Sequence, residues 1–538
     1  MRNGDGSPVA LLEGRGNAQR MNDVGRIGAA TAGKQRPWWD SAPAIAAAIV
    51  VVILPLLYPR IPPLVDMLGH MARFRVELDG SRSTLLQQYF GYRWSPIGNL
   101  GVDLPVRLLA PLVGLEPAVK LVICAIPALT LAGFLWLARE VHGRIPPPAW
   151  FAAPFVYNHA FLHGFVNFAL SMALAFPALA LWVRLGRLDR TRLRAVLFAP
   201  IGLIVYFAHA FGWGVLGLMC FFNEAARLRG LGIAWRTLLL RVALATSVLA
   251  LPILTLLLWR SGGSGSGASD WFNLPAKLVW AETALRDRWR AFDLASVGVA
   301  VLVLGAALRN GRLGFVRELS WPGLALLAAF LLLPSLIFES AYADMRLAPY
   351  LFGLLLIAVR LKDDVPHRYS STLAALAAAF LVVRIAGNGL SFALAADDQQ
   401  SKAEAVPNVA PGARVATFVG FACGGEWALP RNLHLGSLVV IRRYGFSNDL
   451  WLTKALNILE MRYRAPGYYA ADPSQFVLPN GCEDGLHRTI DQSLAAFPRA
   501  DFDYVWLIDA PPFDPRLLAG LEPIWSGAGS QLYRIRRG

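Results

Sequence analysis

The chain has 538 residues, of which 56% are hydrophobic and only 16% charged, and its mean hydropathy is +0.46. A soluble domain usually carries about 25% charged residues, so a wholly soluble enzyme, a disordered chain and a coiled coil are all excluded. The net charge is +15, but the basic residues separate apolar runs instead of gathering as in a nucleic-acid-binding domain. The composition therefore indicates a protein that lies in a lipid bilayer and has no nucleic-acid partner.

Residues 1–36 are polar, Gly-rich and basic, and we expect them to form a disordered cytoplasmic tail. Residues 41–58 carry no charge and are long enough to cross the hydrocarbon core of about 30 Å. A signal peptide would place its apolar stretch nearer the start and end it at a small-residue cleavage site. Ten further spans are predicted at about 118–138, 147–163, 165–183, 195–211, 213–228, 237–259, 294–308, 320–338, 347–360 and 371–394.

The predicted fold is mainly α: a multi-pass transmembrane bundle of about 11 spans over residues 37–396, followed by a small C-terminal extracytoplasmic α/β domain over residues 397–538. Arginines crowd the loops around 139–144, 184–194, 227–236, 309–317 and 360–368. The positive-inside rule places all of these loops in the cytoplasm if the N-terminus is there, which suits a bacterial inner membrane protein. The C-terminal domain and the long loops 59–102 and 260–293 are then periplasmic. Residues 261–270 are expected to be flexible, and 274–292 to lie along the membrane surface.

The tail alternates strand-like and helix-like patterns. Strands are predicted at 414–420, 503–509 and 530–536, and a helix at 433–445. Cys423 and Cys482 lie in this region, where an oxidising compartment permits a disulfide without requiring one. No Cys/His spacing typical of a metal site occurs, so neither a metal nor a cofactor is expected.

The densest polar grouping beside a span lies in the first outer loop. If a helix begins after Pro63, then Asp66, His70, Arg73 and Glu77 share one face. An arginine there can grip a lipid phosphate, the aspartate can accept a proton from a hydroxyl, and the histidine can add a hydrogen bond. The structural alternative makes Asp66 a helix N-cap and the other residues the wet face of the helix.

Five more polar residues are candidates for substrate binding: Asn158, His159, His163, His209 and Arg346. The first three flank the predicted outer turn after the third span and can line a polar cavity. His209 suits a phosphate or hydroxyl, or else simple packing. Arg346 can hold a phosphate headgroup or anchor the helix at the membrane interface. Arg384 lies within the last span, and Asn388 is its nearest polar candidate in the sequence.

The segments LVDMLGHMAR (64–73), WSPIGNLGVDL (94–104) and FVYNHAFLHGFVNFAL (155–170) resemble those of uncharacterised bacterial proteins related to the GT-C superfamily. An aspartate in the first outer loop and an outer α/β tail are similar to features of the same superfamily. The resemblance implies a glycosyltransferase that moves a sugar from a polyprenyl-phosphate donor to a glycan, lipid or protein acceptor. It makes Asp66 the catalytic residue, and His70 and Arg73, with Arg346, the phosphate clamp. The chain departs from the paired acidic motif of that superfamily, because Val65 and Met67 flank Asp66.

Two other functions stay open from the sequence. A transporter or flippase of a lipid-linked or polar solute would use the same intramembrane residues as a path, although no inverted repeat is evident. A non-catalytic assembly protein for envelope polysaccharides would explain why Asp66 has no acidic neighbour.

Overall fold

The structure is a computed structural model that describes residues 36–255, 267–337, 341–451 and 458–537. The chain divides into two units, Met1–Ala46 and Ala47–Gly538. In the first unit, a 3-10 turn at Trp38–Asp40 precedes the start of helix α2. The predicted disordered tail and the first part of the predicted flexible run at 261–270 lie outside the described residues.

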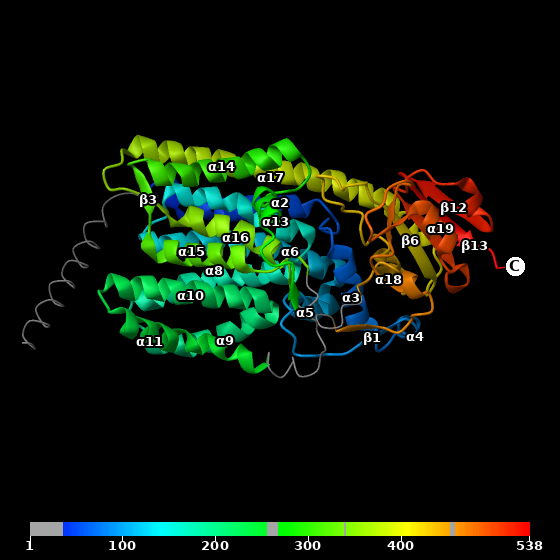
Figure 1. Cartoon of the computed structure of the whole chain (residues 1–538), viewed down its shortest axis with the longest axis horizontal. Coiled ribbons are helices and arrows are strands. Elements are labelled where there is room, and N and C mark those ends of the chain that lie inside the picture. Colours follow the sequence, from blue (N-terminus) through cyan, green and yellow to red (C-terminus); the bar gives the residue numbers. More distant parts are fainter. Residues whose placement is uncertain (1–35, 256–266, 338–340, 452–457, 538) are drawn as a thin grey trace, which may run out of the picture. The chain divides into compact units, whose positions relative to one another are not determined.

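Helices make up most of the second unit, and many run side by side (Figure 1). The α-helices are α2 (Ala42–Leu57), α3 (Met67–Asp79), α4 (Thr84–Gln87), α5 (Asp103–Val113), α6 (Leu115–His142), α7 (His159–His163), α8 (Val166–Arg187), α9 (Thr191–Ala208), α10 (Ala210–Gly230), α11 (Trp235–Thr246), α13 (Leu274–Glu282), α14 (Arg290–Arg309), α15 (Arg317–Leu332), α16 (Ala343–Ala358), α17 (His367–Ala403), α18 (Ser437–Arg443) and α19 (Ile490–Ala496). The 3-10 helices of this unit are η2 (Pro147–Tyr157), η3 (Ser247–Ala250), η4 (Val406–Asn408), η5 (Gly467–Ala470), η6 (Arg499–Asp501) and η7 (Pro515–Leu518).

Five helices of the described chain are long and apolar enough to cross a membrane: α6, α8, α9, α14 and α17; α2 is a shorter apolar helix. The count of eleven spans stays a prediction. The segment predicted as a span at 147–163 is not one α-helix but η2 followed by α7. Prolines such as Pro154 have no backbone N–H to donate, which interrupts the helical hydrogen bonds. Asn158 then caps the next helix, α7, where its side chain accepts a hydrogen bond from the Phe161 N–H at 3.1 Å.

Helix α17 is longer than the span predicted for it. It has 37 residues, about 55 Å at 1.5 Å per residue, which exceeds a hydrocarbon core of about 30 Å. The chain therefore stays helical beyond the predicted span end at 394 and leads toward the C-terminal sheet (Figure 1).

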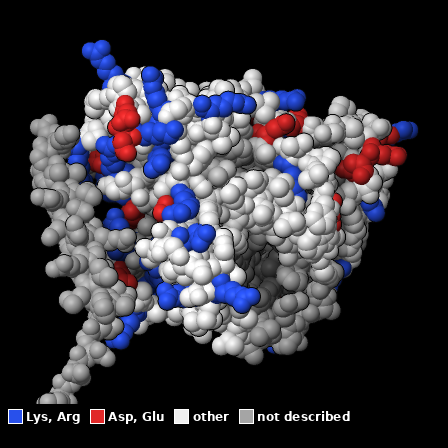
Figure 2. All heavy atoms as spheres, turned by 60° about the vertical axis from the view of Figure 1, so that its left-hand side comes forward, with Lys and Arg blue, Asp and Glu red and all other residues white. Residues whose placement is uncertain are grey.

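The five basic loops gather at one end of the helices. Four contacts connect them: Arg187 with Glu140 (2.6 Å), Arg194 with Glu224 (3.0 Å), the Asn223 amide with the Glu318 carbonyl (2.9 Å), and the His142 ring with the Ile357 carbonyl (2.8 Å). Figure 2 brings this end forward and shows Lys and Arg side chains over it, with fewer Asp and Glu.

The C-terminal region contains a seven-stranded sheet. Its strands are β6 (Arg414–Gly420), β7 (Phe446–Ser447), β9 (Phe476–Leu478), β10 (Arg488–Thr489), β11 (Tyr504–Ile508), β12 (Leu521–Gly527) and β13 (Ser530–Ile535). The order is β10-β9-β6-β11-β13-β12, with β7 also paired to β6. The strands from β10 to β11 are parallel, with Val415 opposite Tyr504, whereas β13 pairs antiparallel with both β11 and β12. All three predicted strands are present, and the predicted helix at 433–445 is the shorter α18.

The first outer loop packs directly against this region. Strand β1 (Phe90–Tyr92) pairs antiparallel with β8 (Leu459–Met461), and α3 packs on α18. Two further pairs tie loops between helices: β2 (Ala268–Ser269) with β4 (Leu336–Ile337), and β3 (Leu313–Phe315) with β5 (Val359–Leu361). The structure joins Cys423 to Cys482 in a disulfide, the pairing that the sequence left open.

Candidate functional site

A cavity of about 510 Å³ lies where α3, α16 and the C-terminal region meet. We call it the Asp66 cavity. Of the residues predicted from the sequence, it is lined by Asp66, His70, Arg73, His163, His209 and Arg346. Residues that are distant in the sequence also line it, among them His434, Trp451 and Asp472.

Asp66 occupies the N-cap position of α3, but its side chain makes no capping hydrogen bond. Its backbone carbonyl accepts from the His70 N–H at 3.1 Å, and its own N–H donates to the His163 carbonyl at 3.0 Å. The side chain keeps 15% exposure at the cavity wall. Helix capping therefore does not explain why an aspartate stands at this position. Burial, reinforced by Asp472 and opposed by Arg346, raises the pKa of Asp66 to about 8.

The turn after α7 fixes the position of Asp66. Gly164 has φ +102°, and a Cβ there would lie 2.7 Å from the Asp66 nitrogen. The adjacent Val65 N–H donates to the Leu162 carbonyl at 3.2 Å. Only glycine suits this conformation and this close approach, so the turn brings His163 and Asp66 to the same wall.

Arg346 supplies a cation to the cavity from the first turns of α16. Its guanidinium lies 4.0 Å from the centroid of the Phe165 ring and donates to the Ala341 carbonyl at 3.0 Å. Its buried Nε has no hydrogen-bond partner. The group therefore keeps donor capacity for an anionic ligand, as a phosphate requires.

Arg73 is held by the protein itself. It pairs with Asp103 at 2.9 Å, and both side chains are buried. The Asn167 amide donates to the same carboxylate at 3.2 Å. Next to this pair, burial and the Asp103 charge raise the pKa of Glu77 to about 7. Arg73 thus adds positive charge to the wall of the cavity, with part of its guanidinium committed to Asp103.

A hydrogen bond orients the His209 ring in the cavity, and ring packing holds the His70 ring. The His209 Nδ1 accepts from the Phe211 N–H at 3.1 Å at the start of α10, so a neutral ring carries its proton on Nε2. The His70 ring lies 5.3 Å from the Trp451 ring, and burial, with Arg73 adding to it, lowers the pKa of His70 well below its ordinary value. Both rings are suited to hydrogen bonding as neutral groups.

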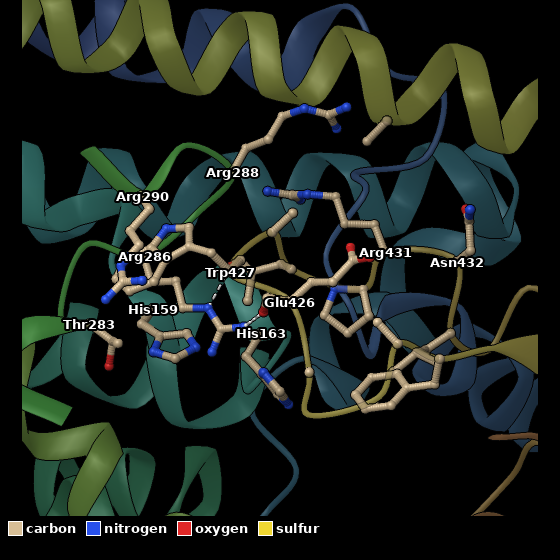
Figure 3. A pocket seen from close by; sticks show the side chains of 18 of the residues that line it. His159, His163, Thr283, Arg286, Arg288, Arg290, Glu426, Trp427, Arg431 and Asn432 are labelled. Atoms are coloured by element: carbon tan, nitrogen blue, oxygen red, sulfur yellow. Dashed lines mark hydrogen bonds between the residues drawn. The ribbon is translucent and has the colours of Figure 1, made fainter. Parts of the chain in front are cut away.

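A second cavity of about 1220 Å³ adjoins the first, and we call it the arginine cavity. Figure 3 shows Arg286, Arg288 and Arg290 around it, with Trp427 between them. His163 lines both cavities. Arg286 is fixed by donating to the Trp427 carbonyl at 2.7 Å and the Glu426 carbonyl at 2.6 Å.

These arginines lie within 274–292, the segment predicted from the sequence to lie along the membrane surface. In the sequence, these arginines alternate with Asp287 and Trp289, and this pattern was the signal that could have indicated a charged cavity wall. The carboxyl ends of β6 and β11 contribute Gly420 and Asp509 to the same cavity, as expected for ligand sites beside parallel strands.

A buried polar network lies beside the arginine cavity. Arg384 pairs with Asp293 at 2.6 Å, whereas Asn388, its nearest polar candidate in the sequence, donates to Asp287 at 2.8 Å. Asp287 also pairs with Arg431 at 2.5 Å. These buried charges compensate one another, as burial requires.

The two remaining predicted residues differ in their surroundings. His159 lines the arginine cavity, and its Nδ1 is buried without a partner. Asn158 is buried, caps α7, donates to the Phe155 carbonyl at 2.8 Å, and is not among the lining residues of either cavity. Among the residues that the structure describes, no group of three or more His, Cys, Asp and Glu could hold a metal ion.

No family model matches the chain, and no curated protein matches it. The chain is similar to two solved structures of ArnT from Cupriavidus metallidurans, one bound to undecaprenyl phosphate and one in the apo state. Each match covers 91% of this chain and 97% of the other, with 13% identity and a TM-score of 0.49. A likeness at this level assigns neither a fold family nor an activity to this chain.

Proposed function

We propose that this protein is an integral-membrane glycosyltransferase of the GT-C kind. It would move a sugar from a polyprenyl-phosphate donor to a glycan, lipid or protein acceptor of the cell envelope. The observation that carries the proposal is the meeting of a carboxyl free of any capping role, Asp66, with a partly unpartnered guanidinium, Arg346, in one cavity. A base and a phosphate clamp are the two groups that such a transfer needs.

The reaction is a direct displacement at the anomeric carbon. The Asp66 carboxylate accepts the proton of the acceptor hydroxyl while the hydroxyl oxygen forms the new bond to that carbon. The bond from the anomeric carbon to the phosphate oxygen breaks, and its electron pair stays on the polyprenyl phosphate. Arg346 and the Nε2–H of His209 stabilise this leaving group.

The arginine cavity is the proposed acceptor side, because His163 lines both cavities and the two ligands can meet there. Arg286, Arg288 and Arg290 suit an acceptor that carries phosphate or carboxylate groups. The Trp427 ring lies 5.7 Å from the guanidinium carbons of both Arg286 and Arg290, in reach of the same ligand.

The proposed membrane orientation follows from two helices that run from the cavity to the basic end. Helix α16 carries Arg346 in its first turn and ends at Ala358, and the carbonyl of Ile357 in its last turn contacts His142 of the basic end. Helix α8 begins beside Asn167 and ends at Arg187. With the basic end in the cytoplasm, both cavities open on the periplasmic side of a bacterial inner membrane. Lipid-linked donors are suited to that side, where nucleotide sugars are absent.

The test uses the purified full chain in proteoliposomes with undecaprenyl-phosphate-linked pentoses and hexoses, and it measures release of undecaprenyl phosphate. We expect Asp66→Asn to lower release by about 10²–10⁴-fold, the usual worth of a general base. Arg346→Met should lower it as well. Arg312→Met is the matched control, because Arg312 is an exposed arginine over the Tyr369 ring (5.4 Å) in a basic loop.

Wild-type release by the Asp66→Asn protein would refute the proposal. Transbilayer movement of undecaprenyl phosphate, unchanged by Asp66→Asn and without any sugar release, would instead assign the protein to the flippase class.

A further inference from the structure

His434 lies in the loop before α18, and its ring is held on several sides. The ring Nδ1 of His434 is 2.6 Å from the Asp449 backbone carbonyl oxygen, and the backbone N–H of His434 donates to Gln475 Oε1 at 3.0 Å. The ring packs on Trp451 with 4.4 Å between centroids. The backbone has φ +60°, a conformation rare for non-glycine residues and often found where a side chain must be held in place.

These contacts determine which nitrogen carries the proton. A carbonyl oxygen only accepts, so the His434 Nδ1 must be the donor to Asp449. In the neutral imidazole, Nε2 then bears the lone pair. Burial lowers the pKa of His434, so the ring is neutral in the ordinary pH range.

The His434 Nε2 atom lies near the proposed base. His434 Nε2 lies 3.8 Å from Asp66 Oδ1, and the two side chains are 3% and 15% exposed. This distance exceeds a hydrogen bond, but catalytic contacts are often long without substrate and tighten in the complex.

We propose that Asp66 and His434 form one proton-accepting pair, in which the C-terminal region supplies a positioning residue to the base of the first outer loop. This inference rests on the proposed function. In the resting pair, the Asp66 carboxyl donates its proton to the lone pair of His434 Nε2. In the reactive pair, that proton resides on Nε2, and the carboxylate so formed accepts the proton of the acceptor hydroxyl. The imidazolium then returns its proton to solvent.

The pair has charged and titratable neighbours from every element around it. They are His70 and Arg73 of α3, His163 of α7, His209 before α10, Arg346 of α16, and Asp449, Asp472 and His487 of the C-terminal region. Asp472 opposes ionisation of Asp66, and Arg346 favours it. None of these groups is changed in the test below, so each contributes equally to all variants.

The test distinguishes the role of Nε2 in the His434 ring from that of Nδ1. His434→Asn keeps a donor near the Nδ1 position for the Asp449 carbonyl and tolerates positive φ, but places no atom at the Nε2 position. His142→Gln is the matched control. His142 is a half-buried histidine whose Nε2 contacts the Ile357 carbonyl at 2.8 Å, and glutamine keeps a donor at that position.

Two measurements are made on each variant. The first is the pH midpoint of the infrared band of the protonated Asp66 carboxyl, identified by its loss in Asp66→Asn, which needs no substrate. We expect His434→Asn to lower this midpoint by about one pH unit, because one hydrogen bond to the protonated acid is lost. The second is the pH profile of undecaprenyl phosphate release, where kcat should fall at least about tenfold with little change in KM.

His434→Gln is the second variant if His434→Asn does not fold. Its amide oxygen can reach the carboxyl but cannot take up the proton, so we expect a wild-type midpoint with a lowered kcat. Unchanged midpoint and kcat in the folded variant would overturn the pair. A lowered midpoint in a protein that releases no undecaprenyl phosphate even as wild type would support the pair and refute the proposed function.

Discussion

Replacing Asp66 with asparagine should stabilise the fold, while it should lower the proposed sugar transfer. The folded protein raises the pKa of this carboxyl from an ordinary value near 4 to about 8. Between these two pH values the unfolded chain releases the proton and the folded chain retains it. The contribution of Asp66 to stability is therefore fully present below about pH 4 and is lost as pH rises through 8. The asparagine side chain has no titratable proton, so the Asp66→Asn variant lacks this dependence of stability on pH.

The size of the effect follows from the pKa difference. Each unit is worth about 1.4 kcal/mol, which gives an upper bound of about 6 kcal/mol above pH 8. The side chain keeps 15% exposure, so we halve this figure to about 3 kcal/mol for solvent screening. At pH 5 the same reasoning leaves only about 1 kcal/mol.

The assay is thermal unfolding of the full chain in detergent micelles at pH 5 and pH 8. The Asp66→Asn protein should unfold at a higher temperature than wild type, by a margin that is larger at pH 8. Asp363→Asn, a change at an exposed carboxyl of a basic loop, should show no such margin. A margin equal at both pH values, or a less stable Asp66→Asn protein at pH 8, would show that the carboxyl is solvated in the folded state.

Three further predictions concern stability. Glu224→Leu should lower the free energy of unfolding by about 3–5 kcal/mol, because Arg194 would stay buried without its partner, whereas a double variant with Arg194→Met should recover most of the loss. Removing the disulfide by Cys423→Ser with Cys482→Ser should cost about 2–4 kcal/mol, given a sequence separation of 59 residues, and thermal unfolding would reveal no shift if the bridge were absent. Gly164→Ala should weaken both folding and undecaprenyl phosphate release, since its Cβ would lie 2.7 Å from the backbone nitrogen of the proposed base; an unaffected variant would contradict the close packing of that turn.

Local patterns in the sequence predicted much of the secondary structure. Helix α3 follows Pro63 as expected, and β6 has the predicted bounds of 414–420, because each signal lies within a few turns or one strand. The hydropathy of 147–163 predicted a span, which the structure forms as η2 followed by α7, because Pro154 and Asn158 interrupt the helical hydrogen bonds.

The partners of the polar residues were harder to predict. Arg384 has Asn388 one turn away, yet it pairs with Asp293, which is 91 residues earlier in the chain. Packing of α14 against other helices brings that carboxylate close, and no helical periodicity reports it. The sequence did not pair His434 with Asp66, because the two residues are far apart in the chain and only the fold brings them together. A single sequence indicates which residues are chemically capable, and the fold decides which of them meet.

The raised pKa of Asp66 favours its neutral, protonated form below about pH 8, and this bears on the proposed role of His434. A donor phosphate that entered the cavity would meet an ionised carboxylate as a like charge, and binding would be opposed. A neutral acid avoids this repulsion and leaves Arg346 available for the phosphate. In the proposed reaction the acid loses its proton before it acts as a base, and His434 Nε2, which bears a lone pair, lies 3.8 Å from Asp66 Oδ1. Because His434 comes from the C-terminal region, the proposed pair forms only when that region is docked on α3.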